Sequence, residues 1–451
     1  MRLALEKVAG MLGTMPPEGL SGEAAGYSID SRSAGPGEVF FAVRGEKRDG
    51  HQFVEAALAA GAAAAVASRG ALRHRGRLLL VADPRAGLQR LAARARRRWS
   101  GRLVAITGSN GKTTTKEITA TLLGARFRVA RSEGNLNNDL GLPLSLLRME
   151  DPAEVAVMEM GMNHGGEIRA LAAIARPDIG VVTNVNPVHL EFFTCLDDIA
   201  AAKRELIESL PEGGTAVLNG DDERVRRFGE AHRGPVVYFG VETEADVRAV
   251  EVEDLGLGGT RFRLEAGGRQ FHLPLAGRHN LYNALAGLAV ARALDVDPES
   301  LVDQVASLAP ARMRGERIEV AGIQIINDCY NSNPSAVERM LDLLASIQAR
   351  RRVAVLGEML ELGPGSESLH RQIGARLARE QFDLVVGVGG AARFLVDQAH
   401  RNGLPPYRLR FFEEAEAAGE FLRTALEEGD AVLFKGSRGV GLERALEPLL
   451  G

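Results

Sequence analysis

Short hydrophobic runs, each closed by turn residues, recur through the middle of the chain. They occupy residues 103–108, 154–161, 179–185 and 215–222, and segments with helical spacing separate them. Near-continuous apolar runs of this length are typical of parallel strands covered on both faces. Residues 246–275 differ, because apolar and polar positions alternate there between glycine turns, which predicts an antiparallel meander. We therefore expect a mostly parallel α/β sheet that ends in a meander.

The flanking regions carry α/β patterns of their own. Residues 1–98 predict a small α/β unit with strands at 38–45 and 78–83 and a helix at 52–61. After Pro310 a second α/β series begins, and it predicts a Rossmann-like, doubly wound unit; its strands are expected at 323–328, 352–357, 384–389 and 431–436. A length of 451 residues suits about three domains. We predict domains at 1–98, 99–310 and 311–451.

The basic run at 90–101 is interpreted as a solvated helix face that leads to the first domain boundary.

Composition narrows the class of protein further. Hydrophobic residues make up 45% of the chain and charged residues 25%, as in soluble globular proteins. The formal net charge of −4 argues against nucleic acid as a partner. Cys195 and Cys329 provide no disulfide framework, which suits a reducing compartment. No apolar run approaches the ~18 residues that span a bilayer, and Glu6 and Lys7 interrupt the first apolar segment. The expected location is the cytoplasm, without membrane insertion.

A phosphate-binding loop is predicted where the first strand of the middle domain meets a helix. The sequence ITGSNGKTTTKEITATLL, residues 106–123, places Gly108-Ser109-Asn110-Gly111 at that turn. Backbone amides and the helix dipole converge on an anion there. Lys112 is expected to neutralise β- and γ-phosphate oxygens, and the Thr113 hydroxyl to reach Mg²⁺. The loop is short, because Ile106 stands where the usual motif has its first glycine.

An acidic residue from a neighbouring strand end should complete a magnesium site. Glu159 meets this requirement, and Asp221 and Asp222 are alternatives by the same reasoning. His189 also follows a strand, but position alone favours a structural histidine. The spacing around Lys203 predicts an ordinary exposed helix lysine.

Beyond these patterns, TGSNGKTTTKE resembles the ATP loop of the Mur ligase family, in which the shortened T-G-x-x-G-K-T form is the rule. Further blocks resemble the family in order along nearly the whole chain: residues 28–32, 39–62, 134–147, 183–191, 200–205, 277–286, 310–316, 328–337, 353–363 and 433–439. DCYNSNP, residues 328–334, is similar to the version in members that add D-alanyl-D-alanine, whereas members that add alanine or diaminopimelate have a histidine after the tyrosine. Two positions depart from the common pattern: Phe192 follows HLE where the family often has glycine, and Leu442-Glu443 stands where Met-Glu is common.

The resemblance implies an ATP-dependent ligase of peptidoglycan precursor synthesis. ATP would phosphorylate the terminal carboxylate of a UDP-muramoyl tripeptide, and the amine of D-Ala-D-Ala would attack the acyl phosphate. The resemblance also implies two Mg²⁺ ions, one held by Thr113 and Glu159 and one by His189 and a carbamylated Lys203. We expect a monomer whose domains close about hinges near residues 99 and 310.

The resemblance assigns further residues by position. The ATP-binding set is Thr107, Gly108, Ser109, Asn110, Gly111, Lys112, Thr113, Asn280, Asn283, Arg312 and Asp328. The substrate-binding set is Asp30, Ser31 and Arg32 for the uridine nucleotide, Asn135, Asn137 and Asn138 for the muramoyl peptide, and Tyr330, Asn331, Asn333, Lys435, Ser437 and Arg438 for the incoming dipeptide. Lys112, His189 and Lys203 are the expected catalytic residues.

Three alternatives remain open from the sequence. Another amide-forming ATPase, such as a folylpolyglutamate synthase, has the same core. Gly387, Gly389 and Ala392 form G-x-G-x-x-A after an apolar strand, with Glu413 about 20 residues further on, a weak signal for a dinucleotide-binding oxidoreductase. A non-catalytic nucleotide-binding protein is the third.

Overall fold

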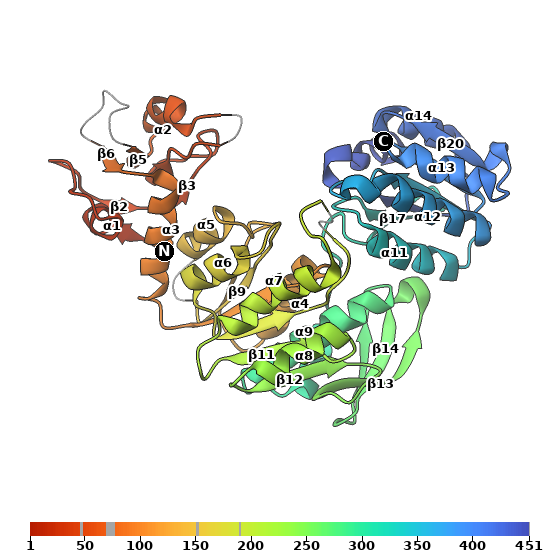
Figure 1. Cartoon of the computed structure of the whole chain (residues 1–451), viewed down its shortest axis with the longest axis horizontal. Coiled ribbons are helices and arrows are strands. Elements are labelled where there is room, and N and C mark those ends of the chain that lie inside the picture. Colours follow the sequence, from red (N-terminus) through yellow and green to blue (C-terminus); the bar gives the residue numbers. More distant parts are fainter. Residues whose placement is uncertain (46–47, 69–76, 150–152, 189–190, 451) are drawn as a thin grey trace.

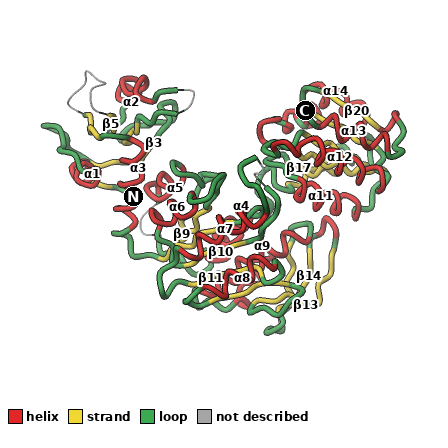
Figure 2. The backbone as a smooth tube through the Cα atoms, in the orientation of Figure 1, coloured by secondary structure: helices red, strands yellow, loops and turns green. Residues whose placement is uncertain are grey.

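The structure is a computed structural model that describes residues 1–45, 48–68, 77–149, 153–188 and 191–450. Within those residues the chain forms three α/β units, each built on its own main sheet. In Figure 1 the amino-terminal and carboxy-terminal units stand apart, at upper left and upper right, and both rest on the central unit below. Figure 2 shows the strands at the centre of each unit with helices around them. The predicted α/β fold class is confirmed, and the exact boundaries stay predictions.

The amino-terminal unit has a parallel sheet in the order β3-β4-β5-β6 and a small antiparallel pair, β1-β2. Its elements are β1 (Leu3–Ala4), α1 (Leu5–Leu12), β2 (Glu23–Ala24), β3 (Gly26–Ser28), β4 (Glu38–Phe41), α2 (Val54–Ala59), β5 (Ala64–Ser68), β6 (Leu78–Val81) and α3 (Pro84–Arg96). Strands β4 and β6 and helix α2 lie within the predicted segments, whereas β1, β2, β3 and β5 were not predicted. The inward side chains of the sheet, including Val39, Phe41 and Val66, are fully buried.

Helix α3 joins the first unit to the second. Arg96 near its end is buried, and its guanidinium donates to Ala175 O at 2.8 Å and to the carboxylate of Asp178 at 2.9 Å. The expectation of a solvated face in this basic segment is therefore wrong for Arg96. Helical spacing alone does not reveal which arginine meets a neighbouring unit.

The central unit has a sheet in the order β15-β14-β13-β12-β11-β10-β7-β9-β8. Its elements are β7 (Arg102–Thr107), α4 (Lys112–Leu123), β8 (Val129–Arg131), α5 (Gly141–Arg148), β9 (Val155–Glu159), α6 (Glu167–Ala175), β10 (Ile179–Val182), α7 (Leu196–Glu208), β11 (Thr215–Asn219), α8 (Glu223–Phe228), β12 (Val236–Gly240), β13 (Val247–Asp254), β14 (Thr260–Leu264), β15 (Gln270–Leu273), α9 (Arg278–Ala293) and α10 (Val302–Ala306). The strands from β8 to β13 pair in parallel, and β13, β14 and β15 pair antiparallel. Both the parallel sheet and the meander are confirmed.

The carboxy-terminal unit has a sheet in the order β16-β17-β21-β18-β19-β20. Its elements are β16 (Glu316–Val320), β17 (Ile323–Asp328), α11 (Pro334–Ser346), β18 (Arg351–Gly357), α12 (Ser366–Arg379), β19 (Leu384–Val388), α13 (Ala392–Arg401), β20 (Leu409–Phe412), α14 (Ala415–Ala425), β21 (Asp430–Lys435) and α15 (Glu447–Leu450). The predicted strands pair in parallel. Strand β16, which the sequence pattern did not indicate, adds antiparallel to β17 as a half-exposed edge. Its residues never become fully buried, so no apolar run marked it.

Candidate functional site

The predicted phosphate loop connects β7 to α4, and its two glycines are required by shape. A Cβ atom at Gly108 would lie 1.9 Å from the Thr183 hydroxyl oxygen. A Cβ atom at Gly111 would lie 2.4 Å from Asn283 Oδ1, and Gly111 has a φ of +82°, where side chains are strained. The loop is therefore held between the end of β10 and helix α9.

Lys112 begins α4 and curls back over the loop. Its Nζ donates to Gly108 O at 2.8 Å and to Ser109 O at 3.3 Å. Burial lowers the pKa of Lys112, the carboxylate of Glu159 raises it, and the guanidinium of Arg314 lowers it. The amine thus stays beside the amides at the helix start, the region where an anion is favoured.

Thr113 and Glu159 form the pair expected from the sequence. The Thr113 hydroxyl donates to Glu159 Oε2 at 2.7 Å, and Asn137 Nδ2 donates to Glu159 Oε1 at 2.7 Å. Glu159 is only 2% exposed, at the carboxyl end of β9, and β9 pairs directly with β7. The alternatives Asp221 and Asp222 serve structural roles: Asp221 accepts from Val241 N at 2.7 Å, and Asp222 accepts from Val225 N in the first turn of α8. Glu159 is therefore the acid that accompanies Thr113.

Lys203 lies inside the molecule, on α7. It is 2% exposed, so the sequence-based expectation of an exposed helix lysine is wrong. Burial lowers its pKa well below the usual value, and the positive charge of Lys112 lowers it further. Within the described part of the chain, no hydrogen bond or ion pair holds its Nζ. His189, predicted beside it, lies outside the described residues.

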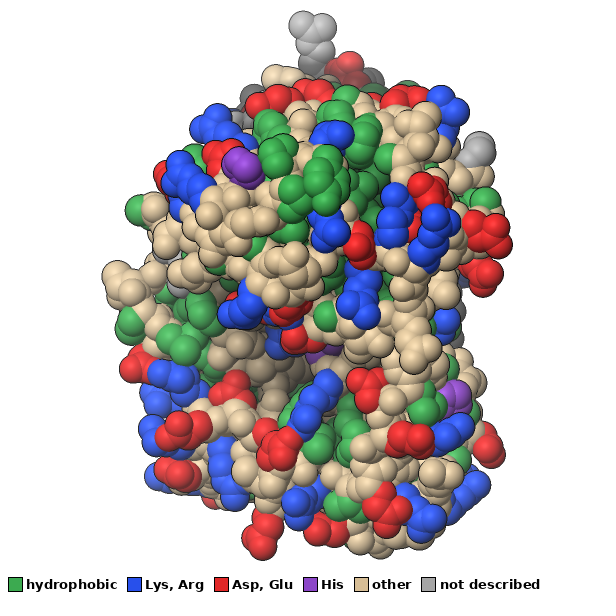
Figure 3. Space-filling model, turned by 90° about the vertical axis from the view of Figure 1, so that its right-hand side faces the viewer, with side chains coloured by type: hydrophobic (Ala, Val, Ile, Leu, Met, Phe, Trp, Pro, Cys, Tyr) green, Lys and Arg blue, Asp and Glu red, His purple; other side chains and the backbone are tan. Residues whose placement is uncertain are grey.

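A cleft of about 860 Å³ runs between the central and carboxy-terminal units. Figure 3 shows the hollow on this face, with charged side chains around it. The predicted residues that line it are Ser109, Asn110, Gly111, Lys112, Thr113, Asn135, Asn137, Glu159, Asn280, Asn283, Asp328, Tyr330, Asn331, Asn333 and Lys435. Thr107, which ends β7, and Gly108, which opens the loop, do not line the cleft; the Thr107 carbonyl accepts from Thr183 N at 3.0 Å. The cleft volume falls in the range of small-molecule sites.

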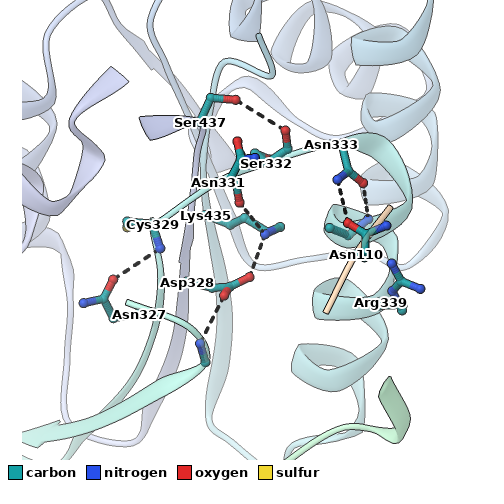
Figure 4. A network of polar contacts seen from close by, with 12 residues as sticks. Asn110, Asn327, Asp328, Cys329, Asn331, Ser332, Asn333, Arg339, Lys435 and Ser437 are labelled. Atoms are coloured by element: carbon teal, nitrogen blue, oxygen red, sulfur yellow. Dashed lines mark hydrogen bonds and ion pairs between the residues drawn. The ribbon is translucent and has the colours of Figure 1, made fainter. Parts of the chain in front are cut away.

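The phosphate loop touches the DCYNSNP block across this cleft. Asn333 Nδ2 donates to Asn110 Oδ1 at 2.7 Å, and Asn110 Nδ2 donates to the Ser335 hydroxyl at 3.2 Å. Figure 4 shows Asn110 and Asn333 pointing toward each other from the two units. Asn333 also caps α11, since its Oδ1 accepts from Ala336 N at 2.9 Å. One side chain thus starts a helix and links two units.

Neighbouring predicted residues form a second network. Lys435 Nζ donates to Asp328 Oδ2 at 2.6 Å and to Asn331 O at 2.9 Å (Figure 4). The adjacent strands β17 and β21 bring Asp328 and Lys435 together. Ser437 and Arg438, which follow, do not line the cleft: the Ser437 hydroxyl accepts from Leu360 N at 2.9 Å, and Arg438 pairs with Glu443 at 2.6 Å.

Several predicted residues lie away from the cleft. Asp30 and Arg32 form an exposed ion pair at 2.5 Å in the amino-terminal unit, and hydrogen bonds from Arg32 lower the pKa of Asp30 to about 2. Ser31 lies between them. Asn138 accepts from Gly141 N at 2.8 Å and thereby starts α5. These residues are not among those that line the cleft.

Arg312 is exposed and does not line the cleft, whereas Arg314 does. Arg314 Nη2 donates to the Thr113 hydroxyl at 3.0 Å, and its guanidinium lies 3.9 Å from the centre of the Tyr330 ring. The structure thus brings Arg314, two residues beyond the predicted one, to the phosphate loop. Both arginines lie in the same sequence block, and the sequence pattern alone does not indicate which of them contacts the phosphate loop.

Other cleft residues had no sequence assignment. The Thr183 hydroxyl donates to Asn110 O at 2.7 Å, and Asn184 Oδ1 accepts from Asn110 N at 2.9 Å. Both follow β10 directly. The rule that ligands lie beyond the carboxyl ends of parallel strands could have indicated them. His279 and Arg339 also line the cleft, and nothing in their spacing marked them.

The glycine-rich turn after β19 does not resemble a dinucleotide site in the structure. The Glu358 carboxylate accepts from Ala391 N at 3.1 Å, at the turn that leads into α13. A Cβ atom at Gly390 would lie 2.5 Å from Glu358 Oε2. The Glu358 carboxylate already accepts from an amide of this turn, and its negative charge would repel a pyrophosphate there. This argues against the oxidoreductase alternative, of which Glu413 was a part.

Comparison with known proteins gives a consistent result. Residues 23–96 match the family model described as "Mur ligase family, catalytic domain", residues 106–291 "Mur ligase middle domain", and residues 313–438 "Mur ligase, glutamate ligase domain". The chain is 33% identical to UDP-N-acetylmuramoyl-tripeptide–D-alanyl-D-alanine ligase of Bacillus subtilis strain 168, over 94% of this chain and 93% of that protein.

Two solved structures are similar over nearly their whole length. MurF from Acinetobacter baumannii has a TM-score of 0.89 at 31% identity, with 100% of this chain and 99% of that chain covered. MurF ligase from Thermotoga maritima in complex with ADP has a TM-score of 0.82 at 33% identity, with 94% and 96% covered. All the matched segments lie in the same order as the three units. The chain therefore belongs to the Mur ligase family.

Proposed function

We propose that the chain joins D-alanyl-D-alanine to UDP-N-acetylmuramoyl-tripeptide in an ATP-dependent reaction of peptidoglycan precursor synthesis. The relatives that match over nearly the whole chain carry this activity in their names. The observation that carries the proposal is the contact between Asn110 and Asn333, because it brings the phosphate loop and the DCYNSNP block into one cleft. A nucleotide and an incoming amine could then meet there.

The residues at the loop would activate the acceptor carboxylate. Lys112, Arg314 and the amides of the loop would hold the polyphosphate and offset the charge that builds up during phosphoryl transfer. The acceptor carboxylate would become an acyl phosphate. The amine of the dipeptide would then form the amide bond and release phosphate. Closure of the cleft would keep water from the acyl phosphate.

The Thr113–Glu159 pair fits Mg²⁺ by its chemistry. A hydroxyl and one carboxylate are hard oxygen ligands, and Mg²⁺ usually completes its shell with phosphates and water rather than with a protein cage. Consistent with this, among the described residues no cluster of three or more acidic, His or Cys side chains could hold a metal. Bound Mg²⁺ would neutralise phosphate charge during transfer. We assign a second ion to Lys203 and His189 only by resemblance to the family.

Lys203 has the properties of a lysine that takes up CO₂. Its amine is buried, its pKa is strongly lowered, and within the described part of the chain it has no polar partner. A neutral amine reacts with CO₂, whereas an ammonium does not. We expect ¹³C-bicarbonate to produce a carbamate resonance by NMR that is absent in Lys203→Arg. A resonance of equal intensity in both proteins would contradict this assignment.

The outer subsites follow from position. The Asp30–Arg32 segment would contact the uridine nucleotide, and Asn135 and Asn137 the muramoyl peptide. Tyr330 and Asn331 would face the dipeptide, and Ser437 and Arg438 would reach it only after the carboxy-terminal unit moves, because they lie outside the cleft.

The decisive experiment is an ADP-release assay with purified protein. UDP-muramoyl tripeptide and ATP should give sustained ADP release only when D-Ala-D-Ala is added, and mass spectrometry should show the pentapeptide product. Folate with glutamate serves as the control for the folylpolyglutamate alternative. Turnover with folate, or none with the tripeptide and dipeptide, would overturn the proposal.

A further inference from the structure

Arg339 stands in the middle of the wall that the carboxy-terminal unit contributes to the cleft. It lies on α11, whose residues along the cleft are Ala336, Arg339, Met340, Asp342, Leu343 and Ser346. The spacing of three and four residues is that of one helix face. Figure 4 shows Arg339 beside Asn110 of the phosphate loop.

This arginine has no acidic partner at short range. Within the described residues no carboxylate lies within ion-pair distance of its guanidinium, and its one side-chain hydrogen bond reaches the Ser335 hydroxyl at 3.5 Å. Glu338, Asp328 and Asp342 act on it only from further away, and burial lowers its pKa. A half-buried cation with only distant carboxylates is incompletely compensated, and an anion in direct contact would complete the compensation.

The surroundings of Arg339 lead toward the phosphate loop. Ser335, its hydrogen-bond partner, accepts from Asn110 Nδ2 at 3.2 Å. On the facing wall, burial and then the charge of Arg339 lower the pKa of His279 to about 4. His279 is therefore neutral near pH 7, so it adds no positive charge to that of Arg339 in the cleft that both residues line. Lys112 and Arg314 line the same space from the loop side.

We propose that Arg339 is an additional nucleotide contact, whose guanidinium pairs with a polyphosphate oxygen of ATP. This inference rests on the proposed function only in that ATP is the nucleotide. Lys112 belongs to the central unit and Arg339 to the carboxy-terminal unit, so the polyphosphate would connect the two units. A guanidinium suits this role because it presents several donors to phosphate oxygens.

Calorimetric binding to the full-length protein tests the proposal without requiring ligation. Arg339→Met should weaken ADP binding by about 10-fold or more, as expected for loss of a charge-assisted hydrogen bond. Adenosine affinity should stay within about twofold, since adenosine has no phosphate. Arg339→Lys should recover most of the ADP affinity because it keeps the charge. Exposed Arg379→Met on the neighbouring helix α12 is the matched control and should bind ADP like the parent.

Two results would overturn the proposal. ADP affinity equal to that of the parent in Arg339→Met would remove the contact altogether. Equal losses for ADP and adenosine, with no recovery in Arg339→Lys, would indicate that the guanidinium stacks on the base instead. Because the readout is binding, a failed ligation assay would refute the proposed function and leave this test intact.

Discussion

At the scale of single residues, Lys112 owes its position to the glycines before it. Gly108 and Gly111 let the backbone pass within contact distance of Thr183 and Asn283, and the lysine then turns over the loop. The same burial that favours a neutral amine makes the site ready for a phosphate, whose charge would hold the proton on Lys112.

Lys112→Ala should abolish most turnover while leaving the protein folded. Loss of one preorganised donor to developing charge typically costs about 10²- to 10³-fold in rate. Stability should stay the same or rise, because the variant no longer buries an amine whose charged form is disfavoured. ADP release and thermal unfolding measure the two effects. Undiminished turnover would remove the phosphate-loop assignment.

His279 should make stability depend on pH in a defined range. Its pKa is lowered from 6.5 to about 4, chiefly by burial and by Arg339 and Lys435, while Asp328 opposes the shift. Between those values the unfolded chain binds a proton that the folded protein does not, so stability falls as the pH is lowered from about 6.5 to 4.

Comparison with His279→Gln isolates this contribution, because the carboxyl groups titrate in both proteins. The parent should lose more stability than the variant over that range, by on the order of 1–3 kcal/mol at about 1.4 kcal/mol per pH unit. Denaturant unfolding at several pH values provides the measurement. Parallel losses in both proteins would show that His279 does not titrate differently on folding.

At the scale of elements, the sequence pattern located most strands and the loop-to-helix turn, because these depend on local periodicity. The runs at β7, β9, β10 and β11 are buried on both faces, and the alternation of β13 to β15 matches a half-exposed meander. Several strands were not predicted, among them β3, β5, β8, β12 and β20; the pattern also missed β16, because a half-exposed edge strand needs no apolar run. Lys203 and Arg96 were expected to be exposed but are buried. Helical spacing alone does not indicate which face of a helix is covered by neighbouring elements.

Asn333→Ala should weaken both a helix and a contact between units. Loss of the cap on α11 should cost about 1 kcal/mol of stability, and loss of the bond to Asn110 should raise the KM for ATP. Asp83, whose side chain caps α3 by accepting from Arg85 N at 2.8 Å, offers a matched control. Asp83→Ala should lose similar stability with an unchanged KM. If the KM for ATP were the same in Asn333→Ala as in Asp83→Ala, Asn333 would act only as a helix cap and its bond to Asn110 would not contribute to ATP binding.

At the scale of the whole molecule, the two outer units are attached differently. Arg96, Arg85 and Arg148 tie the amino-terminal unit to the central one, and a single apolar core runs through both. The carboxy-terminal unit contacts the phosphate loop mainly through polar side chains such as Asn333 and Arg314. Polar contacts are exchanged at little cost, so we expect the hinge near residue 310 to move more than the one near 99.

Closure should be visible in solution. Small-angle scattering should give a smaller radius of gyration when an ATP analogue and both substrates are present than for the protein alone. Both substrates are needed because the segments proposed to bind the uridine nucleotide and the dipeptide lie on opposite outer units. Superimposable profiles would count against closure. No helix in the described part of the chain is long and apolar enough to cross a bilayer.

The sequence by itself indicated most of the elements, the short phosphate loop and the family, because hydrophobic period, turn residues and motif spacing are local properties. Tertiary structure alone decided which polar side chains meet. It brought Glu159 rather than Asp221 or Asp222 to Thr113, brought Arg314 rather than Arg312 to the same hydroxyl, and placed Arg339 in the cleft without an ion-pair contact. These outcomes depend on strand order and on how the units pack. Residues far apart in sequence become neighbours only once the strand order and the packing of the units are established. Their distance in space cannot be inferred from their spacing along the chain.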